Sequence, residues 1–142
     1  MNNITSPRTD GAAIEQEIQA KGLTAPRVTP ADIEANIATE WYFTADEGVV
    51  GKYANRLAAE GLGTYPGDLP KRHKHLSLLT FCVLVLKNGF TVTGESACAS
   101  PENFDAEIGR KIARANTVQK IWPLMGYALK QSLSERACQV PA

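Results

Sequence analysis

The sequence predicts an α+β fold in which a small antiparallel sheet is built on one β-hairpin. The strands are expected at about 76–87 and 90–98, packed with an N-terminal helix and a long C-terminal helix. Asn88-Gly89 stands between two apolar runs, which is the strongest short-range hairpin signal. Ser100-Pro101-Glu102 then predicts a helix start, with a capping hydroxyl, a proline at the first helical position and an early acid.

The strand register follows from the length of the turn. A two-residue type I′ turn at Asn88-Gly89 predicts that Val85 pairs with Val92. On that register one face is the expected core face, with the apolar residues Phe81, Val83, Val85, Phe90 and Val92. The other face carries Cys82, Leu84 and Leu86, which are too apolar to be left in water. A partner subunit is a natural second cover, so the sequence predicts an oligomer.

The long C-terminal helix carries an apolar face and a polar sector. At about 100° per residue, the apolar face is formed by Phe104, Ile108, Ile112, Ala115 and Trp122. Gly109 costs about 1 kcal/mol relative to alanine inside a helix, which favours close approach by a strand or a partner helix. Pro123 is expected to end or kink the helix, and a helical pattern resumes from Leu124 to Leu133.

The polar sector is the candidate ligand-binding feature of this helix. It carries Asn103, Glu107, Arg110 and Arg114. Two arginines one turn apart, beside an amide and a carboxylate, form a fork that can hold a phosphate-bearing ligand. The alternative is a solvent-exposed helix edge with ordinary charge pairs, worth tenths of a kcal/mol each. From spacing alone this alternative is the more common.

The first half of the chain predicts a loosely attached N-terminal extension followed by one helix. Residues 1–26 are expected to form a loosely attached N-terminal extension. Residues 29–43 predict a helix that packs on the sheet, capped by Thr29-Pro30, because Ile33, Ile37 and Trp41 recur at every fourth position. Trp41 is expected to be part of its aromatic anchor.

A glycine- and proline-rich loop with a basic end, residues 61–75, is expected to connect to the hairpin-helix core, residues 76–133. Its last five residues are the run Lys71-Arg72-His73-Lys74-His75. Such a run can contact phosphates. The blander interpretation is a solvated loop whose charge protects an exposed strand entry from aggregation.

Composition bounds the function classes. Equal numbers of basic and acidic residues, 15 each, argue against a general nucleic-acid binder. No apolar stretch reaches membrane-spanning length, and three cysteines without metal-ligand spacing indicate a reducing compartment. There is no phosphate-binding glycine loop and no nucleophile motif around Ser96. We therefore expect a single domain that is not an enzyme, with no cofactor and no metal.

Two segments carry a resemblance to a known family. They are LKNGFTVTGESACASPENFDAEIGRKIAR and KIWPLMGY. Both are similar to the gene-forty-nine/gene-sixty-six family of tailed-phage proteins, and the resemblance extends over roughly residues 27–43 and 76–130. The first 26 residues and the insertion near 61–70 lie outside it.

The type-one Thoeris anti-defence proteins look like members of this family. They are sponges that bind the cyclic ADP-ribose isomer (gcADPR) made by host TIR-domain enzymes and keep it intact. Some also hold cyclic oligonucleotides at a second site, and they assemble as dimers built into a hexamer. The resemblance therefore implies a phage anti-defence protein of the host cytoplasm that sequesters a cyclic nucleotide signal.

The polar sector of the C-terminal helix and the nearby phenylalanines suit such a ligand. Arg110 and Arg114 would take the phosphates, Asn103 the ribose hydroxyls or the base edge, and Phe90 or Phe104 would stack on the purine, with Glu107 beside them. These assignments come from the motif and the helix face, not from contacts transferred from a relative. The competing interpretations are an accessory factor that binds host DNA or a host protein through the basic run, and a structural or virion-associated protein.

Overall fold

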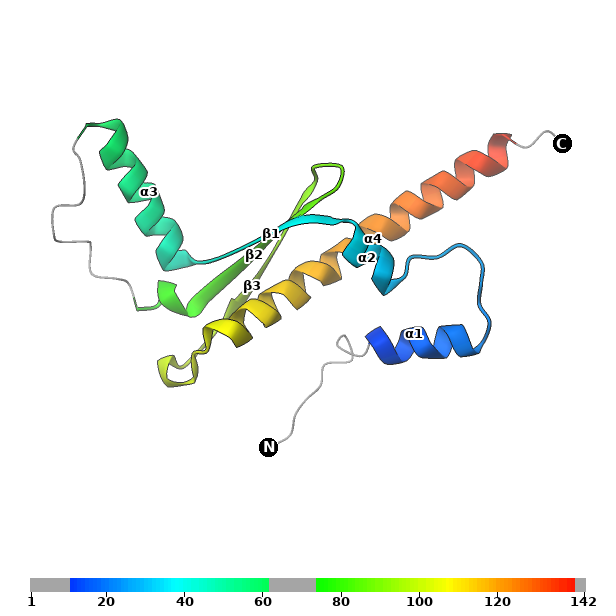
Figure 1. Cartoon of the computed structure of the whole chain (residues 1–142), viewed down its shortest axis with the longest axis horizontal. Helices are drawn as coiled ribbons and strands as arrows, with labels where there is room; N and C mark the ends of the chain where they lie inside the picture. Colours follow the sequence, from blue (N-terminus) through cyan, green and yellow to red (C-terminus); the bar gives the residue numbers. More distant parts are fainter. Residues whose placement is uncertain (1–10, 62–73, 140–142) are drawn as a thin grey trace. The chain divides into compact units, whose positions relative to one another are not determined.

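The computed structural model describes residues 11–61 and 74–139. Its sheet has three antiparallel strands in the order β1-β2-β3, which together with the helices confirms the predicted α+β class. The elements follow one another along the chain (Figure 1) as α1 (Gly11–Ala20), α2 (Pro30–Ala35), β1 (Ile37–Thr44), α3 (Ala45–Ala59), η2 (Leu76–Leu78), β2 (Leu79–Leu86), β3 (Thr91–Ala97), η3 (Pro101–Asn103) and α4 (Ala106–Gln139).

The chain divides into two compact units. The central unit comprises residues 40–84 and 93–117, and the terminal unit comprises residues 1–39, 85–92 and 118–142. The three strands and α4 each contribute residues to both units.

The hairpin turn has three residues instead of the predicted two. Gly89 N donates to Leu86 O at 2.9 Å, and Leu86 N donates to Phe90 O at 2.8 Å, so Lys87, Asn88 and Gly89 form the loop. A type I′ turn needs positive φ at both central residues. Among the described residues only glycines have positive φ, including Gly89 at 88°, so Asn88 cannot fill the first of those positions. The observed conformation is instead a three-residue loop that ends at Gly89, whose φ is positive.

The longer loop shifts the strand register by one residue, and such a shift exchanges the two faces of a strand. Cys98 N donates to Leu78 O at 3.0 Å, which places Cys82 opposite Gly94 in the central unit. The buried positions of β2 are Thr80, Cys82, Leu84 and Leu86. The predicted core face was wrong on β2, where Phe81, Val83 and Val85 are only half-buried, and at Phe90, which is 54% exposed, but Val92 is buried as predicted.

The inward stripe of α4 is made mostly of small side chains. Gly109, Ala113, Thr117 and Ile121 are buried at four-residue spacing. The predicted apolar face was wrong here too, because Ile108 is 55% and Ile112 is 47% exposed.

Small residues face the sheet because the backbones approach closely within the central unit. A Cβ built on Gly94 of β3 would lie 2.6 Å from Thr117 N and 2.9 Å from Ala113 O. A Cβ on Gly109 would lie 3.0 Å from Thr80 Oγ1 on β2, which confirms the predicted close approach of a strand. Thr117 satisfies its buried hydroxyl by donating to Ala113 O at 2.7 Å.

Helix α4 begins later than predicted. Pro101 leads the short helix η3, and Ser100 makes no side-chain capping bond there. Asp105 accepts a hydrogen bond from Ile108 N at 3.0 Å and so provides the acceptor at the start of α4. Pro123 lies inside α4 and does not end it.

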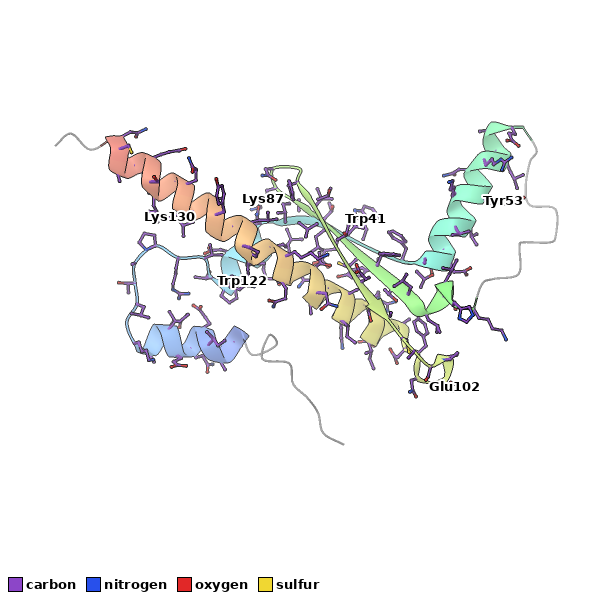
Figure 2. All side chains as sticks on the ribbon, turned by 180° about the vertical axis from the view of Figure 1, so that it is seen from behind. Trp41, Tyr53, Lys87, Glu102, Trp122 and Lys130 are labelled. Carbon is purple, nitrogen blue, oxygen red and sulfur yellow. The ribbon has the colours of Figure 1, made fainter. Side chains whose placement is uncertain are left out.

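The predicted helix over residues 29–43 was only partly right. Thr29 and Asp32 form a reciprocal capping box, as the sequence indicated, but α2 ends at Ala35. The next eight residues, IATEWYFT, form β1, because aromatic and β-branched residues favour a strand and Asn36 O accepts from Lys87 N at 3.0 Å. Trp41, labelled on β1 in Figure 2, is 62% exposed and anchors no helix.

The N-terminal extension contains one ordered attachment. Helix α1 buries none of its residues, and Glu15 forms a two-pronged ion pair with Arg27, at 2.6 and 2.7 Å. This hydrogen bond lowers the pKa of the Glu15 carboxyl to about 2. Most of the predicted 61–75 loop, including Lys71, Arg72 and His73, lies outside the described residues.

Substituting Gly94 with alanine tests the close strand-helix contact. Because the new methyl group would meet backbone atoms, which cannot rotate away, we expect Gly94→Ala to lower the free energy of unfolding by about 1 to 3 kcal/mol. Gly51→Ala is the control, since a Cβ there meets nothing within 4 Å and helix propensity alone raises stability by up to about 1 kcal/mol. Urea unfolding of both variants measures the difference, and equal midpoints would contradict the contact.

Candidate ligand-binding site

A cavity of about 360 Å³ lies within the central unit, where the end of β1, the first turn of α3, η2, the start of β2 and the start of α4 converge. Its lining residues combine aromatic rings, hydroxyls, two carboxylates and one guanidinium: Tyr42, Phe43, Thr44, Asp46, Glu47, Ser77, Thr80, Phe104, Ala106 and Arg110. This size falls at the small end of the range for small-molecule sites.

Local sequence explains the wall formed by α3. Thr44 ends β1 and caps α3, because its hydroxyl accepts from Glu47 N while Glu47 Oε2 accepts from Thr44 N, both at 3.2 Å. This reciprocal box fixes the turn that brings Asp46 and Glu47 to the cavity. Asp46 is 8% exposed, so the carboxylate is held by its surroundings rather than by solvent.

The rings of Phe43 and Phe81 pack together with their centroids 5.6 Å apart. The ring of Phe43 also lies against α3, 3.6 Å from where a Cβ on Gly48 would be. These contacts fix one aromatic side of the cavity.

The two arginines of the predicted fork have different surroundings. Arg110 lines the cavity, and no hydrogen bond or ion pair to another described residue holds its guanidinium. Arg114 instead donates from Nε and Nη2 to Glu40 Oε1 on β1, at 2.9 and 2.7 Å. The structure therefore brings Arg110 to the cavity and engages Arg114 with β1.

Tyr42 and Glu40 extend the ion pair of Arg114. Tyr42 donates its hydroxyl to Glu40 Oε2 at 3.0 Å. The Arg114 hydrogen bond lowers the pKa of Glu40, and burial, followed by the bond to Glu40, raises the pKa of Tyr42. Because Glu40 has a lowered pKa in the fold, its ion pair stabilises the fold near neutral pH and loses that contribution as the pH falls through the acidic range.

The sequence matches the phage protein (N4 Gp49/phage Sf6 gene 66) family over residues 28–133, which is well over half of the chain. The chain belongs to that family. The predicted family resemblance is thus confirmed, and the matched range includes every residue that lines the cavity. No curated protein and no solved structure matches the chain.

The other predicted site residues of this phage protein are dispersed. Phe104 lines the 360 Å³ cavity and, with Asn103, a smaller one of about 200 Å³. Glu107 pairs with Lys111 on the exposed side of α4, at 3.1 Å. Phe90 directly follows the hairpin loop and belongs to the terminal unit, whereas the other five belong to the central unit.

Sequence reasoning missed most of the cavity wall. Tyr42 and Phe43 fell within the wrongly predicted helix, and Asp46 and Glu47 lie in residues 44–60, for which no element was predicted. One signal was available: Thr44 followed by Glu47 is a capping-box pattern, which marks a helix start.

Across the described ranges, no group of three or more His, Cys, Asp or Glu side chains is placed to hold a metal ion. None of the helices in the described part of the chain is both long and apolar enough to cross a membrane.

The hydrogen bond between Tyr42 and Glu40 gives a pH-dependent signal. In Glu40→Gln the charge that holds the phenolic proton is removed, so the pKa of Tyr42 falls, although burial still keeps it above its ordinary value. Ultraviolet titration of the phenolate measures this change, with Tyr42→Phe identifying the contribution of Tyr42 to the curve. An unchanged Tyr42 titration would contradict the bond.

Proposed function

We propose that this phage protein binds a phosphate-bearing cyclic nucleotide in the central cavity and sequesters it without altering it. The proposed ligand is the cyclic ADP-ribose isomer produced by host TIR-domain enzymes, and cyclic oligonucleotides are a related class. In this role the protein acts in the host cytoplasm and silences a defence that depends on the signal.

The proposal is supported above all by the position of Arg110 and by the absence of a bonded carboxylate beside it among the described residues. The guanidinium of Arg110 lies on the wall of the cavity, and no carboxylate among the described residues is bonded to it. It can therefore bind a phosphate without first breaking another ion pair. Arg114 must first leave Glu40 to do the same. The prediction that Arg114 contacts phosphate is therefore secondary to that for Arg110.

The rest of the cavity supports a nucleotide over a bare anion. Phe104 offers a ring on which a purine can stack, and hydroxyls from Thr44, Ser77 and Thr80 offer hydrogen bonds. Ser77 already donates to Lys74 O at 2.7 Å, so its oxygen remains able to accept from a ligand.

Sequestration is also served by self-association. Phe43 and Phe81 are in contact and therefore share a sheet face, and alternation adds Trp41 and Val83 to it. Thr80 and Gly94 occupy the face that meets α4, so these four apolar side chains lie on the opposite face of the sheet, which also carries Thr93 and Glu95 of β3. The four side chains form an uncharged patch that a second copy can cover, with the carboxylate of Glu95 at its β3 edge. We propose that this face joins two copies in a dimer, which can build a larger ring.

Ligand capture tests the sequestration proposal. The protein is mixed with products of an activated TIR enzyme, freed of unbound ligand and heat-denatured, and the released molecule is assayed by mass and by reactivation of the host effector. We expect an intact cyclic ADP-ribose isomer from wild type and at least about tenfold less from Arg110→Ala, because a charge-assisted phosphate contact is lost.

Lys111→Ala is the matched control for Arg110→Ala, since Lys111 is the adjacent cation on α4, is exposed and pairs with Glu107 outside the cavity. Its capture should equal that of wild type, and Arg114→Ala measures the secondary contact. Failure to recover this ligand, and equally cyclic di- and trinucleotides, would rule out sequestration. DNA binding that weakens steeply with salt would instead favour the accessory-factor function.

The sheet face gives a separate prediction about assembly. Light scattering on a sizing column should report a dimer or larger species for wild type, and a smaller species for Trp41→Glu, because a buried charge opposes the apolar contact. Tyr127→Glu is the control, since Tyr127 is an exposed aromatic residue of the terminal unit. A monomeric wild type would refute self-association.

A further inference from the structure

The smaller cavity of the central unit, about 200 Å³ in volume, lies between the sheet and α4. It shares Thr80 and Phe104 with the 360 Å³ cavity that Arg110 lines, so the two cavities are adjacent. Alone, the smaller cavity falls below the usual size of a small-molecule site, whereas the two together have room for a nucleotide.

Thr80 brings a buried hydroxyl to the border between the two cavities. The residue is 4% exposed, and its hydroxyl forms no hydrogen bond with another described residue. Its Oγ1 lies 3.0 Å from where a Cβ on Gly109 would be, and Gly109 lines the smaller cavity. A buried polar group without a partner is rare and unfavourable in a folded protein. A ligand that bonds to Thr80 would therefore satisfy a group that the described part of the fold leaves unsatisfied.

The wall of the smaller cavity suits an uncharged group better than a phosphate. Phe104, Ile108 and Ile112 contribute apolar surface, and Asp105 is the only charged residue among its described lining residues. Ile108 and Ile112 are 55% and 47% exposed, so a ligand can cover them. A phosphate here would meet a carboxylate and no cation, whereas a flat base would bury apolar side chains.

Two more polar side chains line the smaller cavity. Ser96 shares the α4-facing side of β3 with Gly94, because alternate residues of a strand point to the same face. Asn103 contributes an amide, which can both donate and accept. Neither side chain forms a hydrogen bond with another described residue. Both can therefore bond to the edge of a purine, which presents donors and acceptors.

We propose that the smaller cavity holds the purine base of the nucleotide whose phosphate Arg110 binds, and that the Thr80 hydroxyl forms a hydrogen bond with this base. This inference rests on the proposed nucleotide-binding function and adds to it the place of the base. Phe104 borders both cavities and provides the ring on which the base stacks.

The test uses AMP and ribose 5-phosphate, which carry the same charge and differ in the base, titrated calorimetrically into the full-length protein. Wild type should bind AMP at least about tenfold more tightly, because only AMP fills the smaller cavity. Thr80→Val removes the hydroxyl and keeps the shape of the side chain. Its affinity for AMP should fall about fivefold while that for ribose 5-phosphate stays unchanged. Arg110→Ala should weaken the binding of both probes.

Thr91→Val is the matched control, since Thr91 is an exposed threonine of β3 that lines neither cavity. Its affinity for AMP should equal that of wild type. Thr80→Val should also have a urea midpoint no lower than that of wild type, because no hydrogen bond to another described residue is lost. A clearly lower midpoint would overturn the assignment of this hydroxyl to a ligand.

The outcomes separate the base assignment from the proposed function. Equal affinity of wild type for the two probes overturns the base assignment and leaves phosphate binding intact. Undiminished AMP binding by Thr80→Val, as expected if the hydroxyl holds only a water, overturns the role of Thr80, and equal weakening of both probes does so too. Failure of wild type to bind either probe at millimolar concentration counts against both proposals. The comparison in wild type needs no variant to fold.

Discussion

The backbone of β3 approaches α4 so closely at Gly94 that no side chain fits between them, and the arrangement of the central unit depends on this contact. The carbonyl of Ala113 and the amide of Thr117 occupy the space that a Cβ at Gly94 would need. Gly109 makes a similar, looser approach to Thr80 on β2. These contacts fix both the distance between the helix and the sheet and the rotation of the helix about its axis.

That rotation decides which residues of α4 reach the cavity. With Gly109, Ala113 and Thr117 facing the sheet, the next position after Gly109 turns by about 100° and carries Arg110 to the cavity wall. Ile108, on the other side of Gly109, is left exposed. A helix rotated to bury Ile108 and Ile112, as their hydrophobicity suggests, would place different residues beside the cavity.

The sequence was sufficient to predict the fold class, the hairpin, the capping box at Thr29 and a close strand contact at Gly109. It was insufficient for the faces, because each depended on a choice that hydrophobicity alone does not make. One residue of loop length changed which face of β2 matches the buried Val92 of β3, and Asn-Gly is compatible with both loop lengths. On α4, the tight approach of a strand favoured small side chains over larger apolar ones. In β1, pairing with β2 overrode a helical spacing of Ile33, Ile37 and Trp41.

Only one wall of the cavity was predictable from the sequence. Arg110 and Phe104 were found because they lie in the family-specific segment after the hairpin, and both line the cavity. The opposite wall comes from the junction of β1 and α3, some sixty residues earlier in the sequence, and only tertiary folding brings it to α4. Arg114 illustrates a further limit. Spacing places it one turn from Arg110, but Glu40 on β1 engages it, and no periodicity in the helix reveals that partner. Helical periodicity predicts which residues share a face of a helix. The chemistry available on that face depends on the charged residues that other elements place beside it.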